Sequence, residues 1–332
     1  MAGLYEETFV EELRQGALGL LDEWQLSPAT TVTLLNLSEN ATFCADDPST
    51  ERTVVFRVHR PAYHSADEIA SELAWIEALR GSAVVETPAP LEKRDGGYIA
   101  GFDHHGERRH VVAFDFMSGA EPDPETNMAA GFRKLGAISA RLHAHARQWE
   151  RPAGFQRKTW DFEAMFGSRP LWGDWREGMG LDTHSIAVLE RVADKLKHEL
   201  AAYGAGKDRF GLVHADLRLA NLLVEEDRLG VIDFDDCGFS WFVYDFATAV
   251  SFLEHEPYIP ELADAWIEGY RSVAPLSAEH AAMIPTFVMA RRLLLTAWIA
   301  SHAETETAQE LGADYTHGTL ELGERFLSKV VA

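Results

Sequence analysis

The N-terminal part of the chain changes from a helical to a strand-like spacing of apolar residues. Residues 5–25 repeat apolar positions at helical intervals, which predicts an amphipathic helix. Apolar and polar positions then alternate in 30–38, 41–46 and 51–59. Because alternation with a period of two is typical of half-buried strands, three strands are predicted here.

A helix and two more strands are predicted to complete this region. Ser65 and Glu68 have the spacing of a capping box and Gly81 is a typical stop, so a helix is predicted from Ser65 to Gly81. Two strands are expected around 91–102 and 108–117, the first of them broken by an Asp-Gly-Gly turn. The predicted N-terminal region is therefore a small lobe of five strands, with one helix inserted after the third strand.

The rest of the chain has mainly helical spacing. The segment 118–127 contains Gly and two Pro residues, and it predicts a connection between a lobe of residues 1–117 and a lobe of residues 118–332. Two short apolar runs, 222–224 and 230–234, predict a pair of strands joined by a tight turn. Four long helices are also predicted, at 128–148, 184–203, 261–273 and 281–303.

Composition narrows the class of protein. Of the 332 residues, 46% are hydrophobic and 25% are charged, which is ordinary for a soluble globular protein. A membrane span is not expected, and the acidic N-terminal segment is unlike a secretory signal. The only cysteines, Cys44 and Cys237, lie far apart in the sequence, so a reduced cytoplasmic protein is expected instead of a disulfide scaffold.

The net charge of −23 argues against nucleic acid as a partner, since phosphate backbones are bound by clustered Lys and Arg. It favours a cationic partner only weakly, because many cytosolic proteins are acidic for solubility. The oligomeric state cannot be read from these numbers.

Four polar residues with the spacing of a catalytic motif lie around the predicted strand pair. Asn221 precedes the first strand and Asp233 ends the second, so the hairpin brings them together, while Asp216 lies on the loop before them. The fourth is His214, expected to pack within the loop. Mg²⁺ takes oxygen ligands and holds nucleotide phosphates, and a free Asp accepts a hydroxyl proton. These residues predict a kinase with Asp216 as catalytic base and Asn221 and Asp233 as metal ligands.

HADLRLAN (214–221) resembles the H-x-D-x-x-x-x-N catalytic loop of the aminoglycoside phosphotransferase and choline kinase family, relatives of the protein kinases. VIDFDD (231–236) is similar to the metal-binding segment of that family, and YDFATAV (244–250) to the segment whose Asp supports the catalytic loop. The resemblance implies an α+β, bilobal, protein-kinase-like fold with a five-stranded antiparallel N-lobe and a mainly helical C-lobe. It also implies ATP and Mg²⁺ as cofactors. Within that family, the SEN loop (38–40), the FRVHRP strand (56–61) and the IDFDD segment (232–236) resemble two groups. These are the bacterial small-molecule kinases near homoserine kinase type II and the bacterial stress-response Ser/Thr kinase.

The resemblance also indicates residues that contact the nucleotide phosphates. The turn between the first two strands, at Ser38 and Asn40, has no glycine, but backbone N–H groups in a tight turn can still hold phosphate. Arg57 occupies the position on the third strand that is usually Lys. Its expected partner is Glu72, with Glu68, one turn earlier on the same helix, as the alternative.

Two further sets of residues leave alternatives open. Backbone groups from Asp115 to Met117 could read an adenine edge, although an apolar strand end is more often part of the core. Residues 155–180 hold three Trp and three Phe, which could form the acceptor pocket or an ordinary aromatic core. Arg291 and Arg292 could reach the active site or pair with surface acids.

The adjacent histidines His104 and His105 and the pair His143 and His145 are not expected to bind metal. Residues one or two apart on a helix do not face each other, and a third ligand with suitable spacing is missing from the sequence nearby. Structural roles are predicted for all four.

Together these features favour transfer of the γ-phosphate of ATP to a hydroxyl group of a small molecule that could carry an amine. The glycine that usually follows the Asp-Phe of an activation segment is missing after Phe234, which favours a small acceptor. The alternatives are a Ser/Thr protein kinase of the stress-response type and a non-catalytic nucleotide-binding pseudokinase. Hydrolysis at the cluster Asp233, Asp235 and Asp236 is a weaker alternative.

Overall fold

The computed structural model describes residues 7–123, 128–303 and 305–328. The first residues of the predicted N-terminal helix and the end of the predicted connection 118–127 lie outside the described residues. The chain divides into two compact units. Unit 1 contains residues up to 119 together with 150–157, and unit 2 contains 120–149 and everything from 158 onward.

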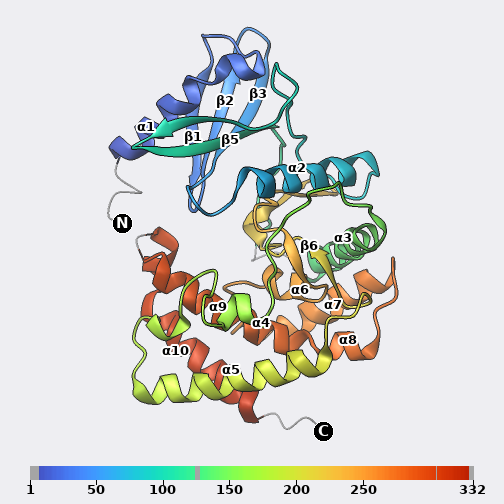
Figure 1. Cartoon of the computed structure of the whole chain (residues 1–332). Coiled ribbons are helices and arrows are strands. Elements are labelled where there is room, and N and C mark those ends of the chain that lie inside the picture. Colours follow the sequence, from blue (N-terminus) through green and yellow to red (C-terminus); the bar gives the residue numbers. More distant parts are fainter. Residues whose placement is uncertain (1–6, 124–127, 304, 329–332) are drawn as a thin grey trace. The chain divides into compact units, whose positions relative to one another are not determined.

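Unit 1 is built on a five-stranded antiparallel sheet with the order β1-β2-β3-β5-β4 (Figure 1). Its strands are β1 (Thr31–Leu37), β2 (Ala41–Asp47), β3 (Arg52–Val58), β4 (Ala100–His104) and β5 (Glu107–Asp115). The alternation of apolar residues predicted β1 to β3, and their inward-facing side chains, such as Phe43, Val54 and Phe56, are fully buried. The predicted antiparallel five-stranded lobe is confirmed.

Helix α1 (Glu7–Leu18) packs against this sheet and is followed by the 3-10 turn η1 (Leu21–Trp24). Leu13 and Ala17 of α1 are buried in the core cluster that includes the inward face of the sheet. Gly16 allows a very close approach to β4, because a Cβ atom at this position would lie 2.3 Å from the ring of Phe102. Helix α1 is therefore held directly over β4.

Helix α2 (Ala66–Gly81) begins and ends as predicted. The Ser65 hydroxyl accepts from the N–H of Glu68 over 3.2 Å, and the Glu68 carboxylate accepts from the N–H of Ser65 over 2.8 Å. This capping box satisfies two backbone donors that have no partner within the helix.

The strand predicted at 91–102 is mostly a loop, so that prediction was wrong. The Asp-Gly-Gly turn closes on itself, with the N–H of Lys93 donating to Gly97 O over 2.6 Å, and it does not lead into a strand pair. The true hairpin turn is His105-Gly106, between β4 and β5. Both residues have positive φ, 51° and 83°, as a two-residue hairpin of type I′ requires.

Unit 2 is mainly helical and carries two small strand pairs. Its long helices are α3 (Met128–Gln148), α5 (Thr183–Tyr203), α7 (Ile259–Arg271), α9 (Ile284–Ser301) and α10 (Glu306–Ser328). Its short helices and 3-10 turns are α4 (Phe162–Phe166), η2 (Trp175–Glu177), η3 (Leu219–Asn221), α6 (Tyr244–Ala249) and α8 (Ala278–Ala282). Its antiparallel pairs join β6 (Phe210–Val213) to β9 (Gly238–Trp241) and β7 (Leu222–Glu225) to β8 (Arg228–Val231).

The helix predicted at 281–303 is divided into α8 and α9. Pro285 lies in the first turn of α9, where its missing N–H costs nothing. It cannot donate to the carbonyl of Ala281 as a helix continuing from α8 would require, so the two helices are separate. By length and composition, Ala278–Ser301 is the one stretch among the described residues that could cross a membrane. However, 72% of its most apolar window is buried inside the protein, as in the core helix of a soluble protein.

Candidate active site

The β7–β8 hairpin carries both predicted metal ligands at its open end. Leu222 and Val231 form the last strand pair there. Beyond it, the N–H of Ile232 donates to the backbone carbonyl of Asn221 over 2.9 Å. Asp233 is the next residue, so the two predicted ligands lie at the same end of one hairpin. Asp233 is exposed and has a left-handed φ of 58°.

Asp216 accepts hydrogen bonds on both carboxylate oxygens. Its Oδ1 accepts from Nη2 of Arg291 over 2.7 Å. Its Oδ2 accepts from Nε of Arg218 over 3.2 Å and from Nδ2 of Asn221 over 2.7 Å. The Asp216 side chain is only 13% exposed. Two guanidinium groups and one amide therefore hold a nearly buried carboxylate in a single orientation.

The charge of Asp216 follows from these contacts. Burial raises the pKa of this carboxyl group, but the charges of Arg218 and then Arg291 outweigh it, so its pKa lies below the usual range. Asp216 is therefore ionised at neutral pH and can accept a hydrogen bond from a hydroxyl group. So stable a carboxylate is a weak base, which suits phosphoryl transfer because the nucleophile there needs orientation more than early deprotonation.

The side chain of Asn221 has a defined orientation. Its Nδ2 donates to the backbone carbonyl of Asp216 over 2.9 Å and to the Asp216 carboxylate over 2.7 Å. An amide nitrogen carries two hydrogens, and both acceptors can only accept. This fixes which end of the amide is nitrogen, so the amide oxygen is directed away from Asp216. The oxygen is the atom of Asn221 that a cation would meet.

Asp245, in α6, supports the loop that carries Asp216. It is fully buried, and its carboxylate accepts from the N–H groups of His214 over 3.3 Å and of Ala215 over 2.8 Å. Nε2 of His143 lies 2.9 Å from the same carboxylate. Ala215 has a left-handed φ of 65°, which costs energy for a residue with a Cβ atom. Asp245 thus compensates for a strained backbone next to the candidate base.

His214 shapes the same loop. Its Nδ1 accepts from the N–H of Asp216 over 3.2 Å, and its Nε2 lies 3.1 Å from the carbonyl of Ile232. Because a backbone N–H only donates and a carbonyl only accepts, these two contacts together fit the tautomer with its proton on Nε2. Both ring nitrogens are engaged in the fold, so His214 is a packing residue and not a base.

Arg57 and Glu72 form a buried ion pair within unit 1. The Nη2 atom of Arg57 donates to both carboxylate oxygens of Glu72, over 2.7 and 2.6 Å. The guanidinium also lies 5.3 Å from the ring centre of Phe114. Glu68, the alternative partner, caps α2 through Ser65. Strand β3 and helix α2 therefore hold the charged guanidinium group of Arg57 in a fixed position.

The remaining predicted nucleotide residues have different surroundings. The β1–β2 turn is closed by the N–H of Ser38, which donates to the carbonyl of Asn40 over 3.2 Å. The Asn40 side chain accepts from the N–H of Arg60 over 3.1 Å, so it serves the fold. At the end of β5, the N–H of Asp115 donates to Ala89 O over 2.9 Å. Met117 is then the better candidate N–H donor for an adenine edge.

Residues 31–280 match the phosphotransferase enzyme family. The chain belongs to this family. The predicted family, the kinase-like fold and the assignment as a kinase are thereby confirmed. The match includes the catalytic loop, the β7–β8 hairpin and the Arg57–Glu72 pair.

Several relatives of this phosphotransferase are kinases. A solved structure of a microcompartment-associated aminopropanol kinase has a TM-score of 0.87 and 46% identity, and covers 94% of this chain and 97% of its own. Homoserine kinase from Gluconobacter oxydans is 30% identical over 252 residues, covering 71% of this chain and 74% of that protein. Amicoumacin kinase from Bacillus subtilis is 25% identical over 254 residues, covering 73% and 72%.

The sequence did not assign a role to either of the two arginines that contact Asp216. Arg218 lies within the motif itself, two residues after Asp216, and the motif does not specify this position. Arg291 is 75 residues away in sequence and was left as either an active-site or a surface residue. It is in fact 2% exposed, and it also donates to the hydroxyl groups of Ser251 over 2.9 Å and Tyr244 over 3.3 Å.

Arg292, the other candidate on α9, belongs to a separate buried cluster. It donates to the carboxylate of Glu254 over 3.0 Å and to the carbonyl of Tyr315 over 2.7 Å. Its Nε donates to the hydroxyl of Thr319 over 2.8 Å. This cluster joins α9 to α10. Of the two alternatives, pairing with surface acids is therefore wrong for both arginines, and Arg291 instead contacts the candidate base.

The tryptophans of 155–180 belong to the core of unit 2. Trp160, Trp172 and Trp175 are each at most 4% exposed, and the first two pack edge to face with ring centres 5.2 Å apart. The guanidinium of Arg291 lies 5.0 Å from the ring centre of Trp172. The segment thus contacts the residue that holds Asp216, although its tryptophans do not line an open groove.

Proposed function

We propose that this phosphotransferase moves the γ-phosphate of ATP to the hydroxyl group of a small amino alcohol. The observation that carries the proposal is the arrangement of Asp216, Asn221 and Asp233. A nearly buried, ionised carboxylate lies in hydrogen-bond contact with an amide whose oxygen is directed away from it, at the end of the hairpin that carries a second carboxylate. These are the groups that phosphoryl transfer to an alcohol requires.

Asp216 is assigned the role of general base. Its carboxylate would accept a hydrogen bond from the acceptor hydroxyl and take the proton as the new oxygen–phosphorus bond forms and the bond to the leaving ADP oxygen breaks. Arg218 and Arg291 hold the carboxylate and keep it ionised. General-base catalysis contributes about 10²–10⁴-fold to the rate of such a step.

Asn221 and Asp233 are assigned as Mg²⁺ ligands. The donor set fits a small hard cation, because one amide oxygen and one carboxylate leave most coordination positions for water and phosphate oxygens. When bound, Mg²⁺ neutralises phosphate charge. A solved structure of the amicoumacin kinase hAmiN contains AMP-PNP and Ca²⁺, which supports a nucleotide and a divalent cation as the cofactors of the family fold.

Unit 1 is assigned to the nucleotide. Arg57, held by Glu72, would pair with phosphate oxygens, and the β1–β2 turn at Ser38 and Asn40 would lie against the phosphates. Backbone groups between Asp115 and Met117 would contact the adenine. An arginine serves here because it keeps its charge even when it is 5% exposed, as Arg57 is.

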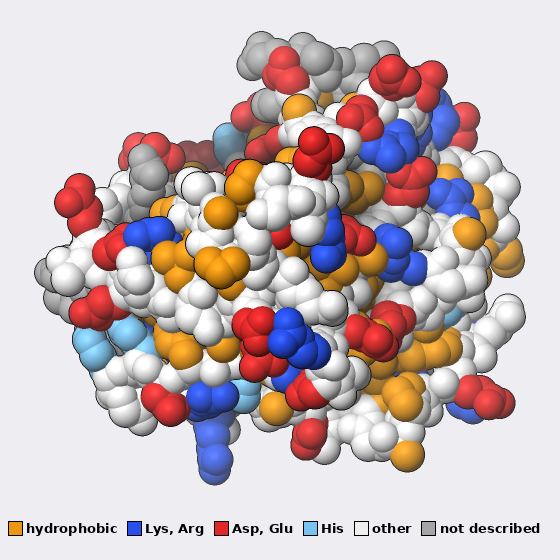
Figure 2. Space-filling view, turned by 90° about the horizontal axis from the view of Figure 1, so that it is seen from above, with side chains coloured by type: hydrophobic (Ala, Val, Ile, Leu, Met, Phe, Trp, Pro, Cys, Tyr) orange, Lys and Arg blue, Asp and Glu red, His pale blue; other side chains and the backbone are white. Residues whose placement is uncertain are grey.

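Two observations support a small, cationic acceptor. The relative at 46% identity is an aminopropanol kinase, so its substrate bears both an amine and a hydroxyl group. The chain also carries a net charge of −23, and Figure 2 shows Asp and Glu side chains scattered over the visible described surface, with Lys and Arg among them. An acidic surface attracts cations and so favours encounter with an amine.

The short connection between β8 and β9 argues against a protein substrate. Only residues 232–237 separate the two strands, so the segment after Asp233 returns at once into β9. This is consistent with the missing glycine after Phe234. The chain then enters α6 after only Phe242 and Val243. A protein kinase has an activation loop after its Asp-Phe motif, whereas a small acceptor does not need one.

The test is a screen for acceptor-dependent ADP release from Mg·ATP. The acceptors are aminopropanol, ethanolamine, homoserine, an aminoglycoside, simple sugars and a generic protein substrate, with Asp216→Asn as the control enzyme. Amino-alcohol-dependent release, with a phosphate ester seen by phosphorus NMR, is the expected result. Release driven only by a protein substrate would favour the protein kinase alternative. ATP binding without turnover on any acceptor would favour the pseudokinase.

A further inference from the structure

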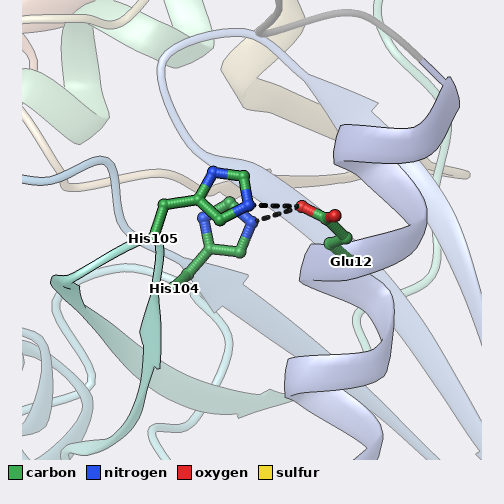
Figure 3. Close-up of side chains that lie close together, drawn as sticks. All are labelled: Glu12, His104 and His105. Atoms are coloured by element: carbon green, nitrogen blue, oxygen red, sulfur yellow. Dashed lines mark hydrogen bonds and ion pairs between the residues drawn. The ribbon is translucent and has the colours of Figure 1, made fainter.

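Three potential metal ligands meet within unit 1. They are Glu12 of α1 and the consecutive residues His104 and His105 at the β4–β5 turn (Figure 3). Nε2 of His104 lies 2.8 Å from Oε2 of Glu12, and Nε2 of His105 lies 3.2 Å from the same oxygen. Their ligand atoms all lie within 4.8 Å of one another.

The turn conformation brings the two rings together. Successive side chains of a strand point to opposite faces, so neighbouring histidines would normally diverge. Here His104 ends β4, and His105 is the first residue of the turn, with a φ of 51°. The left-handed backbone returns its side chain to the side of His104, and the two rings stack with centres 4.1 Å apart and planes 17° apart.

Glu12 is held in place by the packing of α1. The ring of Phe9, one turn earlier, meets His104 edge to face with centres 5.4 Å apart. One turn later, Gly16 rests against Phe102 of β4. His104 is 8% exposed, and His105 extends into solvent with a side chain that is 72% exposed. The cluster is therefore packed against the protein at His104 and exposed to water at His105.

The geometry points to a surface site for a divalent transition cation of the zinc class. Zinc binds imidazole nitrogen and carboxylate oxygen at about 2.0–2.2 Å, so ligand atoms around a tetrahedral ion lie roughly 3.3 Å apart. The nitrogen–oxygen separations of 2.8 and 3.2 Å are close to that value. The exposed His105 ring would also turn out of its stack on His104, so that both Nε2 atoms point at one ion. Water would supply the fourth ligand on the exposed side.

The donor types separate this site from the proposed Mg²⁺ site. Imidazole suits Zn²⁺, Ni²⁺ and Cu²⁺, whereas Mg²⁺ and Ca²⁺ prefer carboxylate, carbonyl and water oxygens. The sequence near His104 and His105 offers no third ligand, but the structure places Glu12 beside both of them. Glu12 is 92 residues from His104 in sequence, so spacing along the chain could not reveal it. A bound ion would link α1 to the β4–β5 hairpin.

The test measures zinc binding to the full chain after treatment with a chelator, by titration calorimetry and by metal analysis after dialysis. His105→Asn removes one ligand but creates an Asn-Gly pair, the preferred sequence for this turn, so the hairpin should fold at least as well. Glu12→Gln removes the second. His184→Gln replaces an exposed histidine of unit 2 and is the matched control.

Wild type and His184→Gln should each bind one equivalent of Zn²⁺. The affinity of His105→Asn and Glu12→Gln for Zn²⁺ should be more than about tenfold lower, because losing even a residue that only hydrogen-bonds to a metal ligand lowers metal affinity by about that factor. Excess Mg²⁺ should leave this binding unchanged. Zinc should also slow hydrogen exchange in α1 of the wild type. Equal affinity in all four proteins, or displacement by Mg²⁺, would overturn the proposal and leave an ordinary His–Glu ion pair.

Discussion

Replacing Arg291 tests whether this arginine sets the protonation of Asp216. Arg291→Met keeps much of the buried volume of the side chain but removes a charge that donates to Oδ1 of Asp216 over 2.7 Å. Since Arg291 is the second-largest cause that lowers the pKa of Asp216, the variant should have a higher pKa at this carboxyl. Asp216 would then be protonated, and inactive as a base, at higher pH than in the wild type.

The size of the shift can be bounded. Two charges about 4 Å apart interact by about 4 kcal/mol at an effective dielectric of 20, which corresponds to roughly three pKa units. Arg218 and Asn221 remain in contact with Oδ2 and retain part of the stabilisation. We therefore expect the acidic limb of the kcat/KM profile to move upward by about one to two pH units, within the range seen for Asp beside Arg.

The assay is the pH dependence of kcat/KM for the acceptor at saturating Mg·ATP. Arg291→Lys keeps the charge and should move the acidic limb less. The matched control is Arg292→Met, the neighbouring buried arginine, which pairs with Glu254 and not with Asp216. Arg292→Met should lower the melting temperature but leave the acidic limb of the kcat/KM profile at the wild-type pH. If Arg292→Met does not fold, Arg292→Lys takes its place as the control. An acidic limb at the wild-type pH in folded Arg291→Met, or equal shifts in both variants, would refute this reasoning.

Three further predictions concern the site. Asp216→Asn should lower turnover by about 10²–10⁴-fold with little change in ATP affinity by calorimetry, and unchanged turnover, once chemistry is shown to limit the rate, would contradict its role as base. Asp233→Ala should abolish the rise in melting temperature that Mg²⁺ with ATP gives the wild type; a wild-type rise would mean that the cation binds elsewhere. Arg57→Ala and Glu72→Ala should weaken nucleotide binding non-additively, because the buried pair acts as a unit, and strictly additive losses in a double-mutant cycle would count against a shared role.

Local patterns predicted the parts of the fold whose contacts are local in sequence. The period-two alternation predicted β1 to β3, and the Ser65 capping box predicted the first residue of α2. Helix α10 was missed because its buried side includes Thr316 and Thr319, which add no apolar period, and because Gly312 interrupts its backbone. Polar side chains that bond to a buried arginine leave no hydrophobic pattern in the sequence.

In the candidate site, too, the sequence predicted the contacts between residues close together in the chain and not those between distant residues. Asp216, Asn221 and Asp233 lie within one continuous motif, so their spacing and the predicted hairpin indicated that they meet. Arg291 reaches Asp216 from a helix far along the chain, and Glu12 reaches the β4–β5 turn from the first helix. Nothing in the sequence near Arg291 or Glu12 marks its partner, because tertiary packing alone brings them together.

The left-handed backbone at Ala215 restricts how the sequence of the catalytic loop can vary. The residue is 1% exposed, its N–H is bound by Asp245, and its φ is 65°. A β-branched or large side chain would meet both a backbone penalty and a filled interior, whereas glycine satisfies both constraints. Mutational scanning should therefore find position 215 almost as intolerant as a catalytic position, although its side chain has no chemical role, with glycine as its one well-accepted replacement.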